Sequence, residues 1–298
     1  MGMADVVPGV SGGTIAFISG IYEELIDSIR SVDATALRLL AHLRLGELWR
    51  HVNGRFLLPV LTGIAIAVFS LARLMTYLLE HHPIEIWSFF FGLIVASALL
   101  VSKQIGRWDW RTAAALAVGA AAAWWITVAT PTETPNDWWF VMLSGAVAIC
   151  AMILTGISGA FILLLLGKYQ YIMQAVGDLN IPVIAIFAVG ATAGIISFSH
   201  LLSWLLKRWH DVTVAVLMGF MVGSLNKVWP WKETVETYTD SHGVLQPLVE
   251  RNIAPGHFEA LYDKPSLLAE AVLLCAAGFL AIYGIELLAR IVLKKREE

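Results

Sequence analysis

The chain has 298 residues, of which 58% are hydrophobic and only 14% are charged, and its mean hydropathy is +0.73. Ordinary globular domains are about 45–50% apolar and about 25% charged, so the composition excludes a typical soluble protein and indicates an all-α integral membrane protein. The net charge of -3 and the scattered basic residues give no reason to expect a nucleic-acid partner.

The first predicted element, residues 1–29, carries the Gly-rich motif PGVSGGTIAFISGIY from Pro8 to Tyr22. Clustered Gly and Ser interrupt a helix, and bare backbone is tolerated in a bilayer only where it is buried in protein or lines a cavity. We therefore expect a re-entrant helical hairpin. Little sequence precedes the motif, so either this hairpin is asymmetric, without most of its leading arm, or the chain begins late.

Residues 30–55 form an Arg-rich connection, for which two interpretations stay open. One is an amphipathic helix that lies at the membrane surface, with its arginines along acidic headgroups. The other is a helix in a solvated loop. The arginines are Arg30, Arg38, Arg44, Arg50 and Arg55, and the apolar stripe is Leu37, Leu40, Leu43 and Leu48.

Six further segments are long enough to cross a bilayer, which takes about 20 apolar residues each. Three precede residue 131 and three follow the second Gly-rich motif. They are approximately Phe56–Leu79, Ile86–Val101, Thr112–Thr130, Pro182–Leu206, Val212–Val228 and Leu267–Leu293.

A second Gly-rich motif, TGISGAFILLLLGKY, runs from Thr155 to Tyr169 inside the apolar segment 138–176 and predicts a second hairpin. The two motifs align without a gap, so that Ser11 matches Ser158, Gly12 matches Gly159 and Tyr22 matches Tyr169. Gly63 to Ser97 likewise aligns with Gly190 to Ser224. Such a repeat predicts a transporter built from two related halves.

The charge distribution predicts that the two halves are inverted. Lys and Arg gather in 30–55, in 103–111, at Lys207 and Arg208, and at the C-terminus, and the positive-inside rule places these on the cytoplasmic face. The acidic connections, including a long external loop at 230–265, then face outward. The first hairpin starts and ends inside and the second outside. We expect halves 1–137 and 138–298, each with one hairpin and about three transmembrane helices.

The two Ser/Gly turns are the predicted binding site. N–H groups at a helix start, with Gly permitting close approach and Ser or Thr adding a hydroxyl, form an anion site. The alternative is that these glycines only allow tight helix packing. The residues assigned to the site are Ser11, Gly12, Gly13, Thr14, Ser158 and Gly159.

Ionisable residues inside apolar segments are costly and usually functional. Arg73 and His200 match each other in the repeat, and with Lys227 they are assigned to the substrate pathway. His200 could instead be a neutral histidine in a helix interface. The alternative for Lys227 is that its side chain only extends to the lipid headgroups. The same alternative holds for Lys168, a lysine beside the second Gly-rich motif.

Asp5, Glu23 and Glu24 flank the first motif and are candidates for proton coupling, since burial of a carboxylate near mid-membrane raises its pKa toward neutrality. The alternative is that Glu23 and Glu24 lie at the cytoplasmic edge and pair with Arg30 or a neighbouring loop. No nucleophile–base pair, P-loop, dinucleotide fingerprint or metal-ligand cluster stands in the sequence, so we expect no enzyme, cofactor or metal.

ADVVPGVSGGTIAFISGIYEELI, GISGAFILLLLGKYQYI and GFMVGSLNKVWPWK resemble the bacterial polyprenyl-phosphate (undecaprenyl-phosphate) transporters of the PopT type, formerly a domain of unknown function. The resemblance covers essentially the whole chain. It implies a flippase in the bacterial cytoplasmic membrane that returns undecaprenyl phosphate, the lipid carrier of cell-wall synthesis, to the inner leaflet. One departure is Thr155, which stands where the family usually has Pro.

Other functions stay open at this stage. The same hairpins would serve a secondary transporter of a small soluble anion or organic acid. An intramembrane enzyme or a membrane scaffold is a third class. Membrane lipid is an expected partner in each case, and a homodimer is left open.

Overall fold

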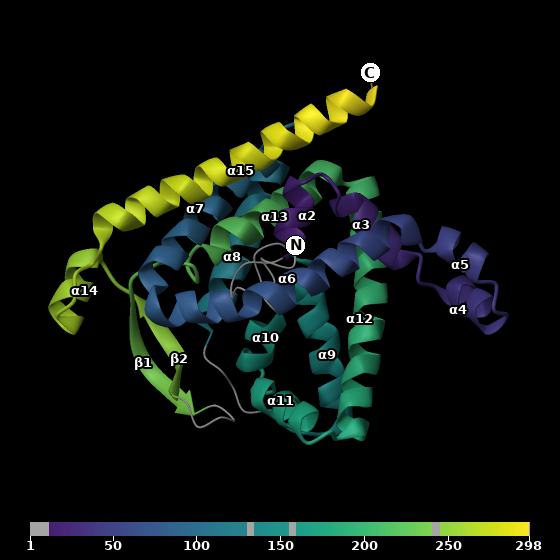
Figure 1. Cartoon of the computed structure of the whole chain (residues 1–298), viewed down its shortest axis with the longest axis horizontal. Helices are drawn as coiled ribbons and strands as arrows, with labels where there is room; N and C mark the ends of the chain where they lie inside the picture. Colours follow the sequence, from purple (N-terminus) through teal and green to yellow (C-terminus); the bar gives the residue numbers. More distant parts are fainter. Residues whose placement is uncertain (1–11, 130–133, 155–158, 240–244, 298) are drawn as a thin grey trace.

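The computed structural model describes residues 12–129, 134–154, 159–239 and 245–297 and is mostly helical. Each half contributes a pair of short helices followed by long helices, and one two-stranded hairpin interrupts the second half (Figure 1). The elements are α2 (Gly12–Ile18), α3 (Tyr22–Arg30), α4 (Ala34–Ala41), α5 (Leu45–His51), α6 (Gly54–His81), α7 (Pro83–Ser102), α8 (Trp110–Val128), α9 (Trp138–Ile153), α10 (Gly159–Leu165), α11 (Tyr169–Gly177), α12 (Ile181–Arg208), α13 (His210–Ser224), β1 (Lys232–Thr239), β2 (Leu245–Asn252), α14 (Pro255–Tyr262) and α15 (Leu268–Glu297).

Several helices have the length and apolar character of membrane spans. Within the described residues, α7, α8 and α12 qualify, and α10 with α11 qualifies as one pair bent by 112°. Shorter apolar helices lie in α6, α9, α13 and α15. Many apolar side chains of these helices are exposed, for example Ile66 on α6 and Val118 on α8, as expected of surfaces that contact lipid. The chain is therefore a multi-pass helical membrane protein.

The short helix pairs have matching ends and a matching turn. The ungapped alignment carries Gly12 and Ile18, the bounds of α2, onto Gly159 and Leu165, the bounds of α10. Both turns use a glycine in the left-handed region, Gly20 at φ 71° and Gly167 at φ 60°. A helix ends readily at such a glycine because it has no Cβ to clash. The local sequence repeat therefore produces the same helix–turn–helix twice.

The long helices after each pair match too. The alignment carries both ends of α6 onto both ends of α12. Each is followed by one residue of the same backbone conformation, His82 at φ -132° and ψ 49° and Trp209 at φ -136° and ψ 58°, before the next helix begins. The repeat seen in the sequence is thus also present in the order and bounds of the helices.

The third long helix of each half packs against the other half. α15 lies along α7, and α8 lies along α13. Glycine brings the backbones together: a Cβ on Gly92 of α7 would lie 1.9 Å from the carbonyl oxygen of Cys275 in α15, and a Cβ on Gly119 of α8 would lie 2.4 Å from that of Val216 in α13. Small residues allow such close helix approach in membranes. Each half therefore packs its last long helix on the other half, α8 on α13 and α15 on α7. This arrangement is called the exchange of α8 and α15 below.

The long helices α6 and α12 differ in what covers them. α12 packs along α9, where a Cβ on Gly190 would lie 1.9 Å from the carbonyl oxygen of Met142. Its repeat partner Gly63, on α6, has nothing within 4 Å of the same position in the described structure. Residues 1–11, which would correspond to the end of α9, lie outside the described residues.

Two predicted segments differ in form from the sequence expectation. The segment 230–265, predicted as a long loop, contains the antiparallel hairpin β1–β2 followed by α14. The segment KETVETYT is rich in Thr, Val and Tyr, which favour strands. The Arg-rich connection is two short helices and not one, because Leu43 takes a left-handed φ of 53° between α4 and α5.

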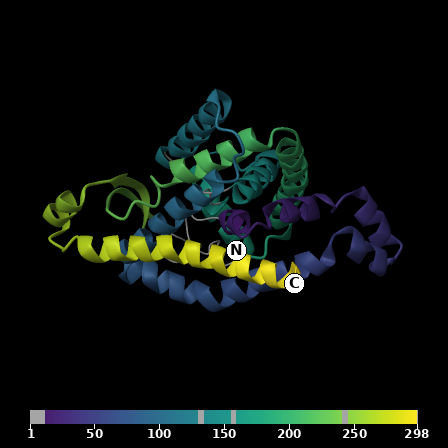
Figure 2. The ribbon, with the colours of Figure 1, turned by 90° about the horizontal axis from the view of Figure 1, so that it is seen from above.

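These two segments lie far apart. Figures 1 and 2 show α4 and α5 at one end of the long axis and β1–β2 with α14 at the other. In Figure 1, α2 and α3 lie on the upper side of the molecule and α10 and α11 on the lower side, with α12 running from one to the other. The core between them joins residues of α2, α3, α7, α12 and α13, among them Ala16, Leu25, Ile94, Leu202 and Leu217.

Candidate functional site

The first Ser/Gly turn leads into α2. Gly12 and Gly13 are buried at the start of this helix. Thr14 is the third residue of α2, but its side chain lies outside the described part, as do Ser11 and Asp5. A Gly–Gly start leaves the backbone N–H groups without side chains over them, which suits a close backbone approach to a ligand.

The second turn is held against α9. Gly159 is the first residue of α10 and is buried, and a Cβ placed on it would lie 2.7 Å from both the Ala148 carbonyl oxygen and the Met152 Cγ. Any larger residue would push α10 away from α9. Ser158 and Thr155 lie outside the described residues.

Tyr22 connects the two repeat units. Its side chain is only 3% exposed, and its hydroxyl donates a hydrogen bond of 3.0 Å to the carbonyl oxygen of Ile153, the last residue of α9. α2 also contacts α9. The start of α3 in the first half therefore lies beside the residues that lead into the second Ser/Gly turn.

Lys168 stabilises the base of the second hairpin. It is 1% exposed, so it does not extend to the headgroups as a snorkelling lysine would. Its Nζ donates hydrogen bonds of 2.6 Å to the Thr134 carbonyl oxygen and to the Asn136 side-chain oxygen. Buried charge is stable only when it is paired or hydrogen-bonded, and these bonds tie the α10–α11 turn to the segment before α9.

The two glutamates after the first motif are exposed and partnered by neighbouring elements. Glu23 lies 3.5 Å from His210 Nε2 at the start of α13. Glu24 accepts a hydrogen bond of 3.0 Å from Asn53, the residue before α6. Both carboxylates therefore sit where α3 meets the beginnings of two long helices.

The pair Arg73 and His200 occupies matched positions of α6 and α12. His200 is exposed, and its Nδ1 lies 2.9 Å from the carbonyl oxygen of Ile196, one turn earlier in the same helix. The Arg73 side chain lies outside the described part of the chain.

Lys227 belongs to a cluster that also contains Lys232 and Glu250. Lys227 follows α13, and its Nζ donates a hydrogen bond of 2.9 Å to Glu250 Oε2. Lys232, at the start of β1, reaches the same oxygen at 3.3 Å. The lysines also contact aromatic rings, Lys227 over Phe161 of α10 at 5.0 Å and Lys232 over Trp87 of α7 at 4.6 Å, in cation–π geometry.

Burial and charge shift the pKa values of this cluster. Burial lowers the pKa of Lys232 to about 8, and the Glu250 carboxylate opposes that shift while Lys227 adds to it. Burial raises the pKa of Glu250, but the two lysines outweigh burial and hold the pKa below its ordinary value. Glu250 therefore remains ionised between two cations that repel each other.

A cavity of about 470 Å³ opens beside this cluster. Part of its lining is a polar network: Asn226 donates a hydrogen bond of 2.8 Å to Thr127 Oγ1, and Asn252 donates one of 2.9 Å to Asn226 Oδ1. Residues of α8, α10, β1 and β2 also line it, and the apolar members are Trp124, Val128, Ala129, Phe161, Leu165, Val235 and Val249. The cavity therefore combines apolar and charged lining.

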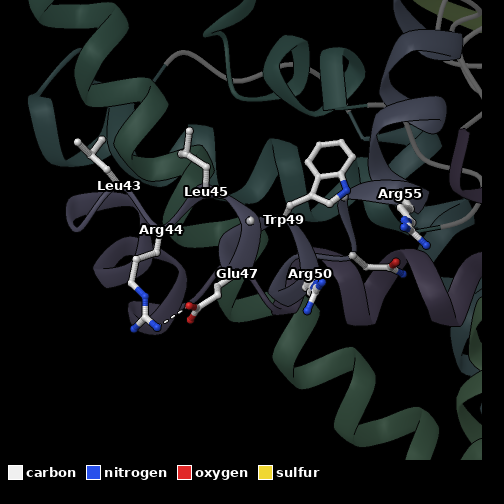
Figure 3. A pocket seen from close by; sticks show the side chains of 10 residues that line it. Leu43, Arg44, Leu45, Glu47, Trp49, Arg50 and Arg55 are labelled. Carbon is white, nitrogen blue, oxygen red and sulfur yellow. Dashed lines mark hydrogen bonds and ion pairs between the residues drawn. The ribbon is translucent and has the colours of Figure 1, made fainter.

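A second, wider cavity of about 960 Å³ lies along α5 and the start of α6. Figure 3 shows its apolar side chains, Leu43, Leu45 and Trp49, on one side of the segment and the charged Arg44 and Arg50 on the other. The three apolar side chains are between 41% and 79% exposed. Such a division is typical of a segment that lies on a membrane surface.

Sequence reasoning found Lys227 but missed its partners. Lys232 and Glu250 lie in the polar insertion 230–265, which has no counterpart in the first half, so the repeat gave no signal for them. To predict this cluster, one would have to recognise from the sequence that the strand with Glu250 pairs with the strand that begins at Lys232. The Thr, Val and Tyr residues of KETVETYT, which favour strands, were the available sign of that strand.

Comparison with known proteins gives consistent matches. Residues 1–246 match the protein family described as undecaprenyl phosphate translocase-like. A polyprenyl-phosphate transporter of Vibrio cholerae is 46% identical over 286 residues, which cover 96% of this chain and 93% of that protein. A polyprenyl-phosphate transporter of Staphylococcus aureus is 32% identical over 248 residues, or 77% of this chain and 83% of that protein. No solved structure matches.

Proposed function

Because the chain belongs to the undecaprenyl phosphate translocase-like family, we propose that it is a transporter of polyprenyl phosphate and not an enzyme. Its substrate is undecaprenyl phosphate, which it moves from the outer to the inner leaflet of the bacterial cytoplasmic membrane so that the lipid carrier can be reused. The relatives named above are polyprenyl-phosphate transporters that align over most of their length.

The physical task explains the need for such a protein. A phosphate headgroup carries about one to two negative charges, and bringing an ion into hydrocarbon costs many kcal/mol. The polyprenyl tail is apolar and remains in lipid without help. A groove that opens sideways to the bilayer, with a polar floor for the headgroup, is sufficient for this substrate.

The headgroup binds at the two Ser/Gly turns, and the two halves form an inverted repeat. The observation that carries this proposal is the correspondence of α2–α3 with α10–α11, including the left-handed glycine of each turn. The opposite placement of the two pairs in Figure 1 and the Tyr22–Ile153 hydrogen bond support it. The proposed ligands are Ser11, Gly12, Gly13, Thr14, Ser158 and Gly159.

Broken helices whose N-termini point at an anionic group recur in inverted-repeat transporters. Arg73, His200 and Lys227 add cationic or donor groups along the pathway. Rocking of one half against the other gives alternating access, with the Arg-rich connection and the C-terminus in the cytoplasm. The α4–α5 segment lies on the inner membrane surface.

The test is translocation of undecaprenyl phosphate by the purified chain in lipid vesicles. Protein-containing vesicles should move the headgroup between leaflets faster than empty ones, and Gly159→Ala, which forces α10 from α9, should reduce the rate at least tenfold. Arg73→Ala should cut transport far more than it lowers thermal stability. Uptake of inorganic phosphate or an organic acid, without lipid movement, would instead support a transporter of soluble anions.

A further inference from the structure

The cavity beside Lys227, Lys232 and Glu250 lies outside both Ser/Gly turns, and the transport proposal gives it no role beyond Lys227. We propose that it is a separate binding site for a phosphate monoester, in which the two lysines exchange the carboxylate of Glu250 for the phosphate. This inference rests on the proposed function for the identity of the ligand, which is the headgroup of the lipid substrate.

The charges around the cavity favour an anion with more than one oxygen. Lys227, Lys232 and Arg251 carry three positive charges and Glu250 one negative charge, which leaves a net charge of +2 on the lining. Both ammonium groups reach one oxygen atom of Glu250, at 2.9 and 3.3 Å. One phosphate oxygen can take that place, while its other oxygens accept from the remaining N–H groups.

Glu250 acts as an internal substitute for the ligand. The two lysines lie close enough to repel each other, and the carboxylate compensates that repulsion in a cluster that is largely withdrawn from water: the side chain of Lys232 is 9% exposed and that of Glu250 20%. A phosphate with two charges neutralises the pair better than a carboxylate with one. Glu250 lies in β2 and lines the cavity, and in this proposal its side chain turns away when a stronger anion enters.

The walls favour an anion that carries an apolar tail. Trp124 and Val128 of α8 are 53% and 47% exposed, and with Phe161 and Leu165 of α10 they give the cavity apolar lining beside its charged groups. Phe161 stands two residues after Gly159, so a headgroup held by Lys227 would lie against the helix that follows the second Ser/Gly turn. The site is therefore placed to receive the headgroup before it reaches that turn.

The test is a binding titration of the purified full-length chain with three probes: inorganic phosphate, farnesyl monophosphate and farnesol. Tryptophan fluorescence reports binding, since Trp124 lines the cavity. Farnesyl monophosphate should bind at least tenfold more tightly than inorganic phosphate, and farnesol should bind weakest. Equal affinity for the two phosphates would identify free phosphate as the ligand and would overturn the lipid assignment.

Variants locate the site. Lys227→Met and Lys232→Met should each weaken phosphate binding about tenfold or more, Lys232→Arg should retain it, and Glu250→Gln should tighten it several-fold because the internal competitor loses its charge. Lys264→Met, an exposed lysine near the start of α15, is the matched control and should bind as the parent does. Unchanged affinity in both methionine variants, or weaker binding by Glu250→Gln, would overturn the proposal.

The two proposals fail in different ways. If Lys232→Met cannot be purified folded, Glu250→Gln and Lys227→Met still decide the site. Normal lipid translocation together with unchanged phosphate binding in these variants would reject this site and leave the transport function standing. Absence of lipid translocation by the parent protein would reject the transport function, whatever the titration shows.

Discussion

Tyr22 and Tyr169 occupy the same place in the repeat but have different surroundings. The Tyr22 hydroxyl bonds the carbonyl oxygen at the end of α9. Tyr169 begins α11, and its hydroxyl forms no hydrogen bond within the described part of the chain. The equivalent tyrosines thus offer a matched pair of substitutions, one of which breaks the contact between the halves.

Tyr22→Phe should leave the Ile153 carbonyl oxygen without this donor and lower the free energy of unfolding by about 1 kcal/mol. Transport should fall by more than this loss of stability accounts for, because the bond positions the entry to the second turn. Thermal unfolding and vesicle translocation measure the two effects. Tyr169→Phe should change neither; equal effects of the two substitutions would contradict the role given to Tyr22.

Lys232 predicts a pH dependence of stability. Its pKa is lowered from 10.5 to about 8 in the folded protein, so between these values the unfolded chain binds the proton more readily. The contribution of Lys232 to the free energy of unfolding therefore rises as pH increases from 8 to 10.5, by roughly 2 kcal/mol. Below pH 8 the lysine is charged in both states and the cost of burying the charge is constant.

The measurement compares the stability of the parent and of Lys232→Met across this range, so that effects of other groups cancel. The difference, parent minus variant, should become more positive from pH 8 to 10.5 and stay flat between pH 6 and 7.5. A difference that falls with rising pH would show that the Glu250 ion pair outweighs the cost of burial.

At the scale of elements, the glycines of α6 and α12 predict opposite outcomes for the same substitution. Gly190→Ala drives a methyl group into the backbone of α9 and should destabilise the protein by about 1–3 kcal/mol. Gly63→Ala meets no atom within 4 Å among the described residues and should be neutral or stabilising by up to about 1 kcal/mol, because alanine favours helix more than glycine does. Thermal unfolding in the same detergent compares them; similar melting temperatures would contradict the packing described for α12.

Hydropathy and the repeat predicted where most of the helices lie in the sequence. They did not predict which helices pack against each other. Four of the six predicted spans fall within α6, α7, α8 and α12, apart from two residues at the end of the α8 segment, because an apolar run of about 20 residues fixes a helix locally. The span predicted at 212–228 runs four residues past the end of α13, and the one at 267–293 begins one residue before α15. Which helix covers which is set by side-chain fit between distant segments. The exchange of α8 and α15, which depends on glycines such as Gly92 and Gly119, was therefore not predictable from each helix alone.

The candidate site also contains residues that the sequence predicted and residues that it did not. Gly12, Gly13 and Gly159 could be found because the repeat marks them twice. Lys232 and Glu250 could not, because they come together through a strand pairing inside an unrepeated insertion. Lys168 stands out in the sequence as a lysine in an apolar segment, but its burial depends on its bonds to Thr134 and Asn136, which no local pattern encodes.

For the whole molecule, we keep proton coupling through the first hairpin as a prediction, with Glu23 as its carrier and Asp5 and Glu24 as further candidates. Glu23 lies 3.5 Å from His210 Nε2, so its carboxylate faces a second ionisable side chain where α3 meets α13. A carried proton makes lipid translocation depend on the pH gradient across the vesicle. Glu23→Gln should abolish that dependence, whereas Glu24→Gln, which alters only the bond to Asn53, should preserve it.

The assay measures translocation with and without a gradient for parent and Glu23→Gln. Equal rates in all four conditions would remove Glu23 from the mechanism. A gradient effect that survives in the variant would point to another carrier, and the same assay on Asp5→Asn would test it.

The exchange of α8 and α15 has a consequence for biogenesis. During synthesis α7 enters the membrane long before α15 is made, and until then its Gly92 face has no helix against it. The first half therefore cannot mature as an independent unit, and α15, made after every other described helix, closes the first half as well as the second. Domains generally fold in the order of synthesis, but here the insertase and the proteases of the membrane meet an open intermediate until the 30 residues of α15 arrive.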